Sequence, residues 1–307
     1  MTERIRIGTR GSPLARAQAE EVIAGLRKVD PRCRPEVVII TTHGDEGYRS
    51  DLGTAFEGKR AFTKRIEEAL LDGRIDAAVH SLKDVPTEAT DGLALAAIPS
   101  RADPRDALVA KDGLSLGQLL GHARIGTSSL RRRGQLLARW PNLEVLEIHG
   151  NVETRVRHVE TGALDGVVVA TAGLGRLGLA GPRAEPIDPD IVTPAPGQGA
   201  LAVQTRTDGD PIERIVSAID DPNARATTDA ERSLSARIGG GCNVPLGAFA
   251  TLSDGTLHLR AVVTSPDGHR VARASARGAA GDWRRVVERA ERQLFESGAE
   301  RIVAEAR

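Results

Sequence analysis

Short apolar runs alternate with amphipathic stretches over the first two-thirds of this 307-residue chain. The apolar runs have the length and composition of strands, and they lie at 4–9, 37–42, 75–80, 93–98, 124–126 and 166–170. The stretches between them repeat apolar residues at helical spacing, at 12–28, 63–71, 129–140 and 152–161. Ser12 and Pro13 form a good start signal for the first helix. This alternation predicts parallel α/β units.

Two short patterns occur twice in this region. The segment RIGT at 6–9 returns at 124–127, and GRID at 73–76 has a counterpart, GALD, at 162–165. The ordinary sequence pattern of a strand, a turn and a helix can produce repeated segments, or echoes, this short by chance. Together they favour two related α/β domains, each with a strand that leads into a helix N-terminus, on either side of a shared cleft.

The pattern changes after about residue 222. A helical stretch at 224–238 leads into a loop of three glycines and Cys242, and strands follow at 244–250, 256–264 and 270–276. Polar turns join these strands, which indicates antiparallel pairing. An amphipathic helix at 282–296 would cover one face. We therefore expect a small α+β domain that begins near 220–223.

Composition and charge narrow the classes of function. The 42 Lys+Arg balance 42 Asp+Glu, and 40% of residues are hydrophobic, as in soluble globular proteins. Four Phe, two Trp and one Tyr are too few for a base-stacking platform. No apolar run reaches the ~18 residues of a membrane span, and the start lacks the core of a signal peptide, which favours the cytoplasm. Cys33, Cys242 and the histidines lack metal-ligand spacing, so we expect free thiols and no metal.

The strongest local anomaly is an imbalance of charge. Between Gly113 and Leu143 there are five arginines and no acid, and three of them occupy the first turn of the helix predicted at 129–140. Cations there oppose the helix dipole at a cost of ~0.3–1 kcal/mol each. Helix stability therefore does not explain them, and an anion site at a helix N-terminus does. A solvated basic face is the alternative.

Two further segments can carry chemistry. The segment HSLKDVP at 80–86 follows a buried-type strand, at the end where open α/β sheets hold ligands. Asp84 is either a general acid/base and counter-charge for a cation or part of an ordinary solvated turn. Cys242 is either part of a flexible loop or an accessible thiol for covalent attachment.

At these residues the chain resembles the porphobilinogen deaminase (hydroxymethylbilane synthase) family. The matching segments are GTRGSPLA at 8–15, VHSLKDVP at 79–86, DPRDA at 103–107, GTSSLRR at 126–132, GNVETR at 150–155, PGQGA at 196–200 and GGCNVP at 240–245. They follow the family's order over nearly the whole chain. No single segment is decisive, but their joint occurrence by chance is negligible.

The resemblance implies two periplasmic-binding-protein-like (type II) α/β domains around a cleft, plus a small C-terminal α+β domain. The boundaries it implies are 1–99 with 193–219 for domain 1, 100–192 for domain 2 and 220–307 for the cofactor-attachment domain. It also implies a transferase with a dipyrromethane cofactor on a thioether to Cys242. Four porphobilinogens lose ammonia and add in turn, and hydrolysis releases hydroxymethylbilane. Each pyrrole carries two carboxylates, which many arginines would bind.

The same matches imply roles for individual residues. Asp84 matches the catalytic aspartate, which would stabilise an azafulvene cation and move protons. The cofactor would contact Cys242, Lys83, Asp84, Thr127, Ser128, Ser129, Arg131, Arg132 and Arg155. The substrate would contact Arg10, Ser12, Gln18, Phe62, His149, Arg155 and Arg176, and Lys59 and Arg60 match an active-site loop. His149, Ala55 and Arg60 stand where members usually have Arg, Lys and Gly, which bears on affinity and loop closure rather than on reaction class.

Two other classes share some of these features. A two-domain small-molecule (polycarboxylate) binding protein has the same cleft, but the periplasmic kind needs an export signal. A nucleic-acid binder could use the arginines at 131–133 and would bind DNA in a salt-dependent way. We therefore expect a cytoplasmic, monomeric enzyme whose partner is its substrate porphobilinogen, with no nucleic acid and no membrane.

Overall fold

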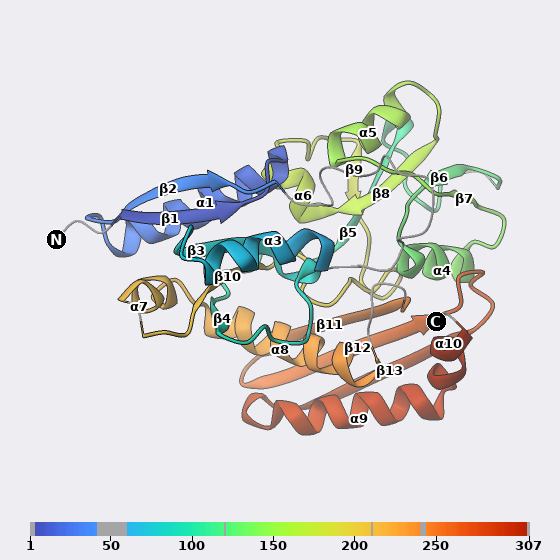
Figure 1. Cartoon of the computed structure of the whole chain (residues 1–307). Helices are drawn as coiled ribbons and strands as arrows, with labels where there is room; N and C mark the ends of the chain where they lie inside the picture. The colour runs from blue at the N-terminus through green and yellow to red at the C-terminus, as the bar shows by residue number, and fades with distance from the viewer. Residues whose placement is uncertain (1–3, 42–59, 120, 210, 240–243, 306–307) are drawn as a thin grey trace. The chain divides into compact units, whose positions relative to one another are not determined.

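The computed structural model describes residues 4–41, 60–119, 121–209, 211–239 and 244–305, with side chains from Thr63 onward in the second of these ranges. The chain divides into two compact units (Figure 1). The first unit is Met1–Ala102 with Ala200–Arg225, and the second is Asp103–Gly199 with Ala226–Arg307. No helix in the described ranges is long and apolar enough to cross a membrane.

A five-stranded mixed sheet forms the centre of the first unit. Its strand order is β2 (Arg34–Ile39), β1 (Arg4–Thr9), β3 (Ala77–Ser81), β10 (Leu201–Arg206) and β4 (Leu93–Ala97). Strand β1 is parallel to β2 and β3, whereas β10 is antiparallel to β3 and β4. Helices α1 (Pro13–Val29) and α7 (Pro211–Ser217) pack on one face, and α3 (Arg60–Leu71) packs on the other. Cys33 is buried in the core with α1 and α7.

The second unit contains a sheet of the same topology. Its strand order is β7 (Glu144–Leu146), β6 (Arg124–Gly126), β8 (Gly166–Ala170), β5 (Asp106–Ala110) and β9 (Ala184–Pro186). Strand β6 is parallel to β7 and β8, and β5 is antiparallel to β8 and β9. Helix α4 (Leu130–Arg139) covers one face, and α5 (Val152–Glu160) and α6 (Thr171–Arg176) cover the other.

The prediction of purely parallel units is wrong for the fourth strand of each sheet. Strand β10 of the first sheet comes after all strands of the second sheet, and β5 of the second comes before the rest of its own sheet. The chain therefore crosses between the sheets twice. Neither β5 nor β10 was among the predicted strands, and a short apolar run does not disclose the direction of a strand. The fold is that of two periplasmic-binding-protein-like α/β domains, as predicted.

The echoed segments occupy equivalent places in the two sheets. In the first, the backbone N–H of Arg6 donates to Asp76 at 2.7 Å, and its guanidinium donates at 2.6 and 3.0 Å. In the second, Arg124 makes the same contacts with Asp165, at 2.8 Å from the backbone and at 3.1 and 3.2 Å from the guanidinium. The predicted relation between the two α/β domains is thus confirmed by matching ion pairs.

The glycine of each echoed segment lies against an equivalent apolar side chain, where a Cβ would be too close. A Cβ on Gly8 would lie 2.2 Å from Cδ1 of Ile75, and a Cβ on Gly126 would lie 2.6 Å from Cδ1 of Leu164. Both distances are well inside van der Waals contact, so either alanine would force the packed side chain to move. The strand therefore passes close to the loop before β3 or β8 in both sheets.

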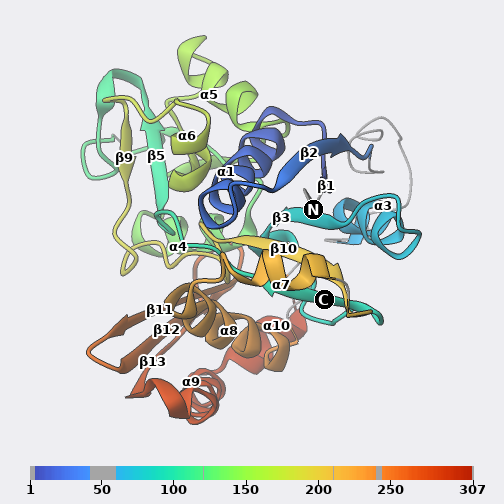
Figure 2. The same cartoon turned by 90° about the vertical axis from the view of Figure 1, so that its left-hand side faces the viewer.

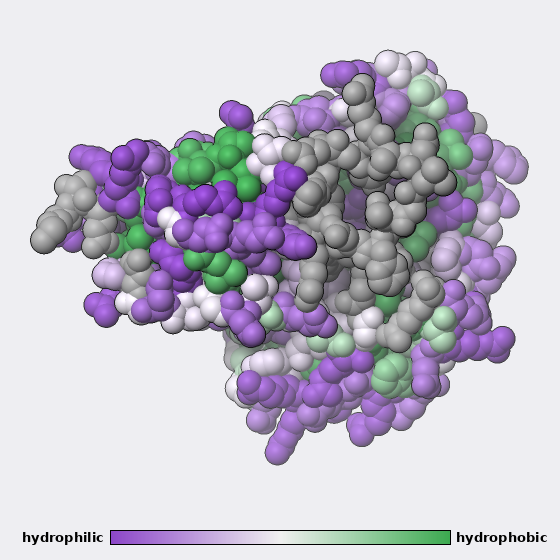
Figure 3. All heavy atoms as spheres, viewed as in Figure 1, coloured by the Kyte–Doolittle hydropathy of each residue, from purple (hydrophilic) through white to green (hydrophobic). Residues whose placement is uncertain are grey.

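A third sheet, also in the second unit, forms the predicted α+β domain. Strands β11 (Leu246–Ser253), β12 (Thr256–Thr264) and β13 (Val271–Ala279) are antiparallel. Helices α8 (Pro222–Arg237), α9 (Trp283–Glu296) and α10 (Ala299–Glu305) share one core with one face of this sheet (Figure 2). The outward side of α9, at the lower edge of Figure 3, is largely hydrophilic, as its amphipathic pattern predicts.

Candidate active site

Strand β3 delivers Asp84 to the carboxyl end of the first sheet. The strand passes directly into a 3-10 turn, Leu82–Asp84, which the N–H of Val85 closes by donating to the carbonyl of Leu82 at 3.1 Å. Leu82 is fully buried and anchors the turn, whereas Lys83 and Asp84 are half-buried. Within the described residues, no hydrogen bond or ion pair occupies the Asp84 carboxylate. The turn therefore holds a carboxylate that is available to a ligand.

Helix α1 brings a second group of polar residues to the same edge. Gln18 is buried, and its Nε2 donates to Oγ of Ser81 at 2.8 Å. Ser12 is the N-cap of α1, where its Oγ accepts from the N–H of Ala15 at 3.3 Å. Because β1 and β3 are parallel neighbours, their carboxyl ends meet at one edge. This edge carries the predicted residues Arg10, Ser12, Gln18, Lys83 and Asp84.

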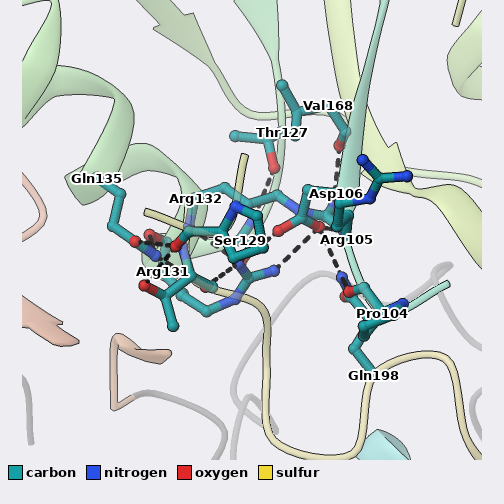
Figure 4. Close-up of polar contacts among 12 residues, drawn as sticks. Pro104, Arg105, Asp106, Thr127, Ser129, Arg131, Arg132, Gln135, Val168 and Gln198 are labelled. Carbon is teal, nitrogen blue, oxygen red and sulfur yellow. Dashed lines mark hydrogen bonds and ion pairs between the residues drawn. The ribbon is translucent and has the colours of Figure 1, made fainter. Parts of the chain in front are cut away.

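A buried cluster of three charges lies in the second sheet (Figure 4). Arg131 and Arg132, in the first turn of α4, are only 5% and 6% exposed, and Asp106 of β5 is fully buried. Arg131 Nη1 donates to Oδ2 of Asp106 at 2.6 Å, while Arg132 Nε and Nη2 lie 2.8 and 2.7 Å from Oδ1. The two guanidiniums also donate to the carbonyls of Thr193 and Val168, at 2.8 and 2.9 Å. One net positive charge remains in the cluster.

The protonation states follow from these contacts. Burial pushes the pKa of Asp106 upward, but the charges of Arg131 and Arg132 and the hydrogen bonds from Arg131 and Gln198 hold it well below its ordinary value. Burial lowers the pKa of Arg132, and the charge of Asp106 opposes that effect. A guanidinium remains protonated in proteins, so all three groups are charged at neutral pH. The arginines thus form a pre-positioned pair rather than the solvated face considered above.

A chain of hydrogen bonds connects this cluster with α8. Gln198 Nε2 donates to Oδ1 of Asp106 at 3.0 Å, and the neighbouring N–H of Gly197 donates to Oε2 of Glu231 at 2.7 Å. Glu231 is fully buried on α8, and its Oε1 accepts from the N–H of Ala250 at 2.8 Å. The segment that contains Gly197 and Gln198 is therefore held by hydrogen bonds both to the arginine cluster and to α8.

The loops after β6 and β7 supply more of the predicted residues. Ser129 caps α4 by accepting from the N–H of Arg132 at 3.4 Å, and its own N–H donates to Oγ1 of Thr127 at 3.2 Å. Arg155, in the first turn of α5, donates from Nε to the carbonyl of Gly150 at 2.9 Å. Ser128 lies between the two capping residues of the first loop.

Two predicted residues lie elsewhere along the same edge. Arg176, at the end of α6, donates from Nη2 to the carbonyl of Gly199 at 3.2 Å. His149 has a half-exposed side chain, and its Nε2 lies 3.6 Å from Oε1 of Glu147. Strands β6, β7 and β8 are parallel, so the residues that follow them share the carboxyl edge of the second sheet.

The structure thus gathers the predicted residues into two sets, one at the carboxyl edge of each sheet. The remaining predictions, Cys242, Lys59 and Ala55, lie outside the described residues, as do the side chains of Arg60 and Phe62.

Sequence reasoning missed the buried partners. Asp106 was part of the matched DPRDA segment, but no role was assigned to it, and Gln198 and Glu231 were not singled out. An acid at the start of an apolar strand was the available signal at Asp106. His80 was also missed, and burial lowers its pKa to about 4 against an opposing hydrogen bond with Gln204. His80 is therefore a neutral core residue.

Two five-stranded mixed sheets of the same topology and an attached α+β domain define a chain built from two related α/β domains and a smaller third one. The model of the porphobilinogen deaminase dipyrromethane cofactor-binding domain matches residues 5–214, and that of the porphobilinogen deaminase C-terminal domain matches residues 226–296. The chain belongs to the porphobilinogen deaminase family. It is a transferase of tetrapyrrole biosynthesis with a dipyrromethane cofactor, as the resemblance implied.

Similar proteins extend over nearly the full chain. The porphobilinogen deaminase of Chromobacterium violaceum is 45% identical over 98% of this chain and 97% of its own length. That of Rubrobacter xylanophilus is 47% identical over 99% and 97%. Among solved structures, the second substrate-binding domain of Lactococcus lactis GlnP, in its open conformation, has a TM-score of 0.44 and 11% identity, over 70% of this chain and 87% of that one. The last likeness is too slight to carry an argument.

Proposed function

We propose that the chain condenses four porphobilinogens head to tail on a dipyrromethane bound through Cys242, and that water then releases hydroxymethylbilane. The observation that supports this most directly is the Asp84 turn, which holds an available carboxylate at the carboxyl end of a buried strand. When bound, the cofactor would supply the nucleophilic pyrrole carbon to which the first unit is joined, and each later unit would join the terminal pyrrole of the growing chain. The chain's own residues bind the carboxylates and move the protons.

Asp84 serves each condensation in two ways. Porphobilinogen loses its amino group as ammonia, which leaves a substrate-derived cation that a nearby carboxylate stabilises. When the new carbon–carbon bond forms, the nucleophilic pyrrole carbon loses its proton, and a carboxylate within reach accepts it. Gln18, which is hydrogen-bonded to Ser81 before the turn, helps to orient the bound pyrrole.

The arginines receive the acetate and propionate groups. Asp106 holds Arg131 and Arg132 in fixed rotamers, and the excess positive charge of this cluster attracts carboxylates to the N-terminus of α4. Asp106 is therefore a positioning residue. The remaining binding residues are Arg10, Ser12, Lys83, Thr127, Ser128, Ser129, His149, Arg155 and Arg176, together with Phe62, Lys59 and Arg60 of the loop.

We also propose the domain boundaries, the oligomeric state, the location and the partner. The domain boundaries are 1–99 with 193–219, 100–192 and 220–307. The enzyme acts as a monomer in the cytoplasm, and porphobilinogen is its partner. It binds no nucleic acid.

The function is tested by the turnover of porphobilinogen in Asp84→Asn and in the matched control Asp91→Asn. Asp91 is an exposed aspartate of the same unit. We expect kcat to fall by at least ~10²-fold in Asp84→Asn, the usual scale for an acid/base group, and to stay near wild type in the control. Near-normal turnover in Asp84→Asn would move the catalytic role to another residue, and absence of hydroxymethylbilane from the wild-type reaction would refute the activity.

A further inference from the structure

A polar groove of about 660 Å³ lies over the third sheet, on the face opposite its hydrophobic core. Residues of β12 and β13 form its floor, and the ends of the groove reach Asp190 and Thr193 at one side and the last turn of α9 at the other. The residues that matter for binding are His258, Arg260, Arg273, Ser275, Arg277 and Asp190.

The strand register places the basic residues side by side. His258 pairs with Arg277 and Arg260 pairs with Ser275 across β12 and β13. Arg273 and Arg277 are four residues apart on one strand, which is roughly 13 Å at about 3.3 Å per residue. Arg260 therefore lies between them on the neighbouring strand, and three guanidiniums follow the groove.

The acids near the groove do not neutralise the three guanidiniums. Asp190 pairs with Arg260 at 2.5 Å, and the guanidinium of Arg260 also stacks over Phe249 at 5.3 Å. Arg273 and Arg277 are exposed, and neither has an acidic partner in the described part of the chain. Glu296 lines the α9 end without forming an ion pair among the described residues. Three arginines thus face two acids.

His258 does not add a charge at neutral pH. Burial lowers its pKa, the charges of Arg277 and Arg260 lower it further, and Asp190 opposes them. Its Nε2 lies 2.8 Å from Oγ of Ser275, so the pair presents a neutral ring and a hydroxyl to the groove. One of the two donors is used in this mutual hydrogen bond, so the pair retains one donor for an oxyanion.

Protection of an exposed sheet edge does not explain the arginines. Charged residues often defend an edge strand such as β13. Here side chains of α9 and of its C-cap Ser297 already hydrogen-bond the backbone of this edge strand. Gln293 accepts from the N–H of Ser275 at 2.9 Å. Ser297 donates to the carbonyl of Arg273 at 3.4 Å, and Arg289 donates to that of Arg277 at 2.5 Å. Like charges on neighbouring strands are destabilising. The arginine side chains therefore have no structural role that the described contacts reveal.

We propose that this groove is an anion-binding site for an extended small polyanion with at least two oxyanion groups. Arg273 and Arg277 would each bind one group, and the Ser275–His258 pair would donate one hydrogen bond between them. Phosphates and carboxylates share this chemistry. None of the three groove arginines belongs to the buried cluster around Asp106, although Thr193, at one end of the groove, accepts from Arg131 of that cluster. Asp84 belongs to the other unit of the chain.

Calorimetric titration of the cofactor-loaded enzyme with tripolyphosphate and with 1,2,3,4-butanetetracarboxylate tests the proposal. We expect saturable binding of at least one probe, weakened about tenfold or more in the double variant Arg273→Gln/Arg277→Gln, since it removes two charge-assisted contacts. The matched control is Arg285→Gln/Arg292→Gln, which removes two exposed arginines of α9 and should bind as wild type does. The stronger of the two probes identifies the class of oxyanion.

A second readout locates the binding. The ring resonance of His258, identified by its loss in His258→Gln, should shift when the probe is added to wild-type enzyme and should stay in place with the double variant. The proposal is overturned if neither probe binds, if both double variants bind as wild type does, or if the resonance does not respond. Melting temperatures of both double variants close to wild type are expected, because the altered side chains are exposed.

Discussion

The variant Asp106→Asn removes the one negative charge that holds two buried guanidiniums. Asp106 Oδ1 accepts from Arg132 at 2.8 Å and from Gln198 at 3.0 Å, and Oδ2 accepts from Arg131 at 2.6 Å. Asparagine keeps the shape, but its amide nitrogen would face a donor from one of the arginines. Loss of one partner of a buried ion pair costs about 3–5 kcal/mol, because the other charge stays buried without compensation. We expect a loss of that size in the free energy of unfolding.

Urea denaturation at pH 7 measures this loss, and Asp103→Asn provides the control. Asp103 pairs with Arg105 at 2.6 Å, but the two side chains are 31% and 42% exposed. Exposed pairs contribute roughly 0.2–1 kcal/mol, so the two variants should differ by at least about 2 kcal/mol. Equal, small losses in both variants would refute the view that Asp106 fixes the arginine pair.

The pH dependence gives an independent check. The pKa of Asp106 is lower in the folded protein than in the unfolded chain, so its stabilising contribution is complete above about pH 4 and declines as the pH falls below that value. The difference in stability between wild type and Asp106→Asn should therefore shrink in acid. A difference that stays constant down to pH 3 would contradict the assigned charge state.

Two further predictions concern histidines. His80 has a folded pKa of about 4 against ~6.5 in the unfolded chain, so its contribution to stability is complete above pH 6.5 and has fallen by about 2 kcal/mol at pH 5. In His80→Gln, urea denaturation should show a smaller loss of unfolding free energy between pH 7 and pH 5 than in wild type, and an equal loss in both proteins would contradict this. His149→Arg should lower the KM for porphobilinogen, because a guanidinium is always charged and binds a carboxylate through two hydrogen bonds. An unchanged KM would show that His149 does not bind carboxylates.

Local patterns predicted the local features of the fold. Helix α1 begins at Pro13 with Ser12 as its cap, and β6 spans Arg124–Gly126, both as expected. Strands β5 and β10 were not predicted, and their antiparallel direction depends on partners far away in the chain. Strand β10, for example, pairs Val203 with Val79. Such pairing is set by packing of the whole sheet and leaves no periodic signal of its own.

In the candidate site too, positions set by the local sequence were predictable, and those set by distant contacts were not. Asp84 lies at the end of a buried strand as expected, since a polar turn after an apolar run fixes that position. The burial of Arg131 and Arg132 was not predictable, because the two arginines are on helix α4 and their counter-charge, Asp106, is on strand β5, 25 and 26 positions away. Whether a basic run is solvated or buried depends on such tertiary contacts.

The mass of the purified chain tests the central claim most directly. If Cys242 anchors the cofactor, intact-mass analysis will show an increment equal to two linked pyrrole units, and peptide mapping will place it on the peptide with Cys242. Cys242→Ser should lose the increment, while Cys33→Ser, altered at the buried thiol of the first sheet, should keep it. A fully active chain of unmodified mass, or an increment on Cys33, would contradict the account.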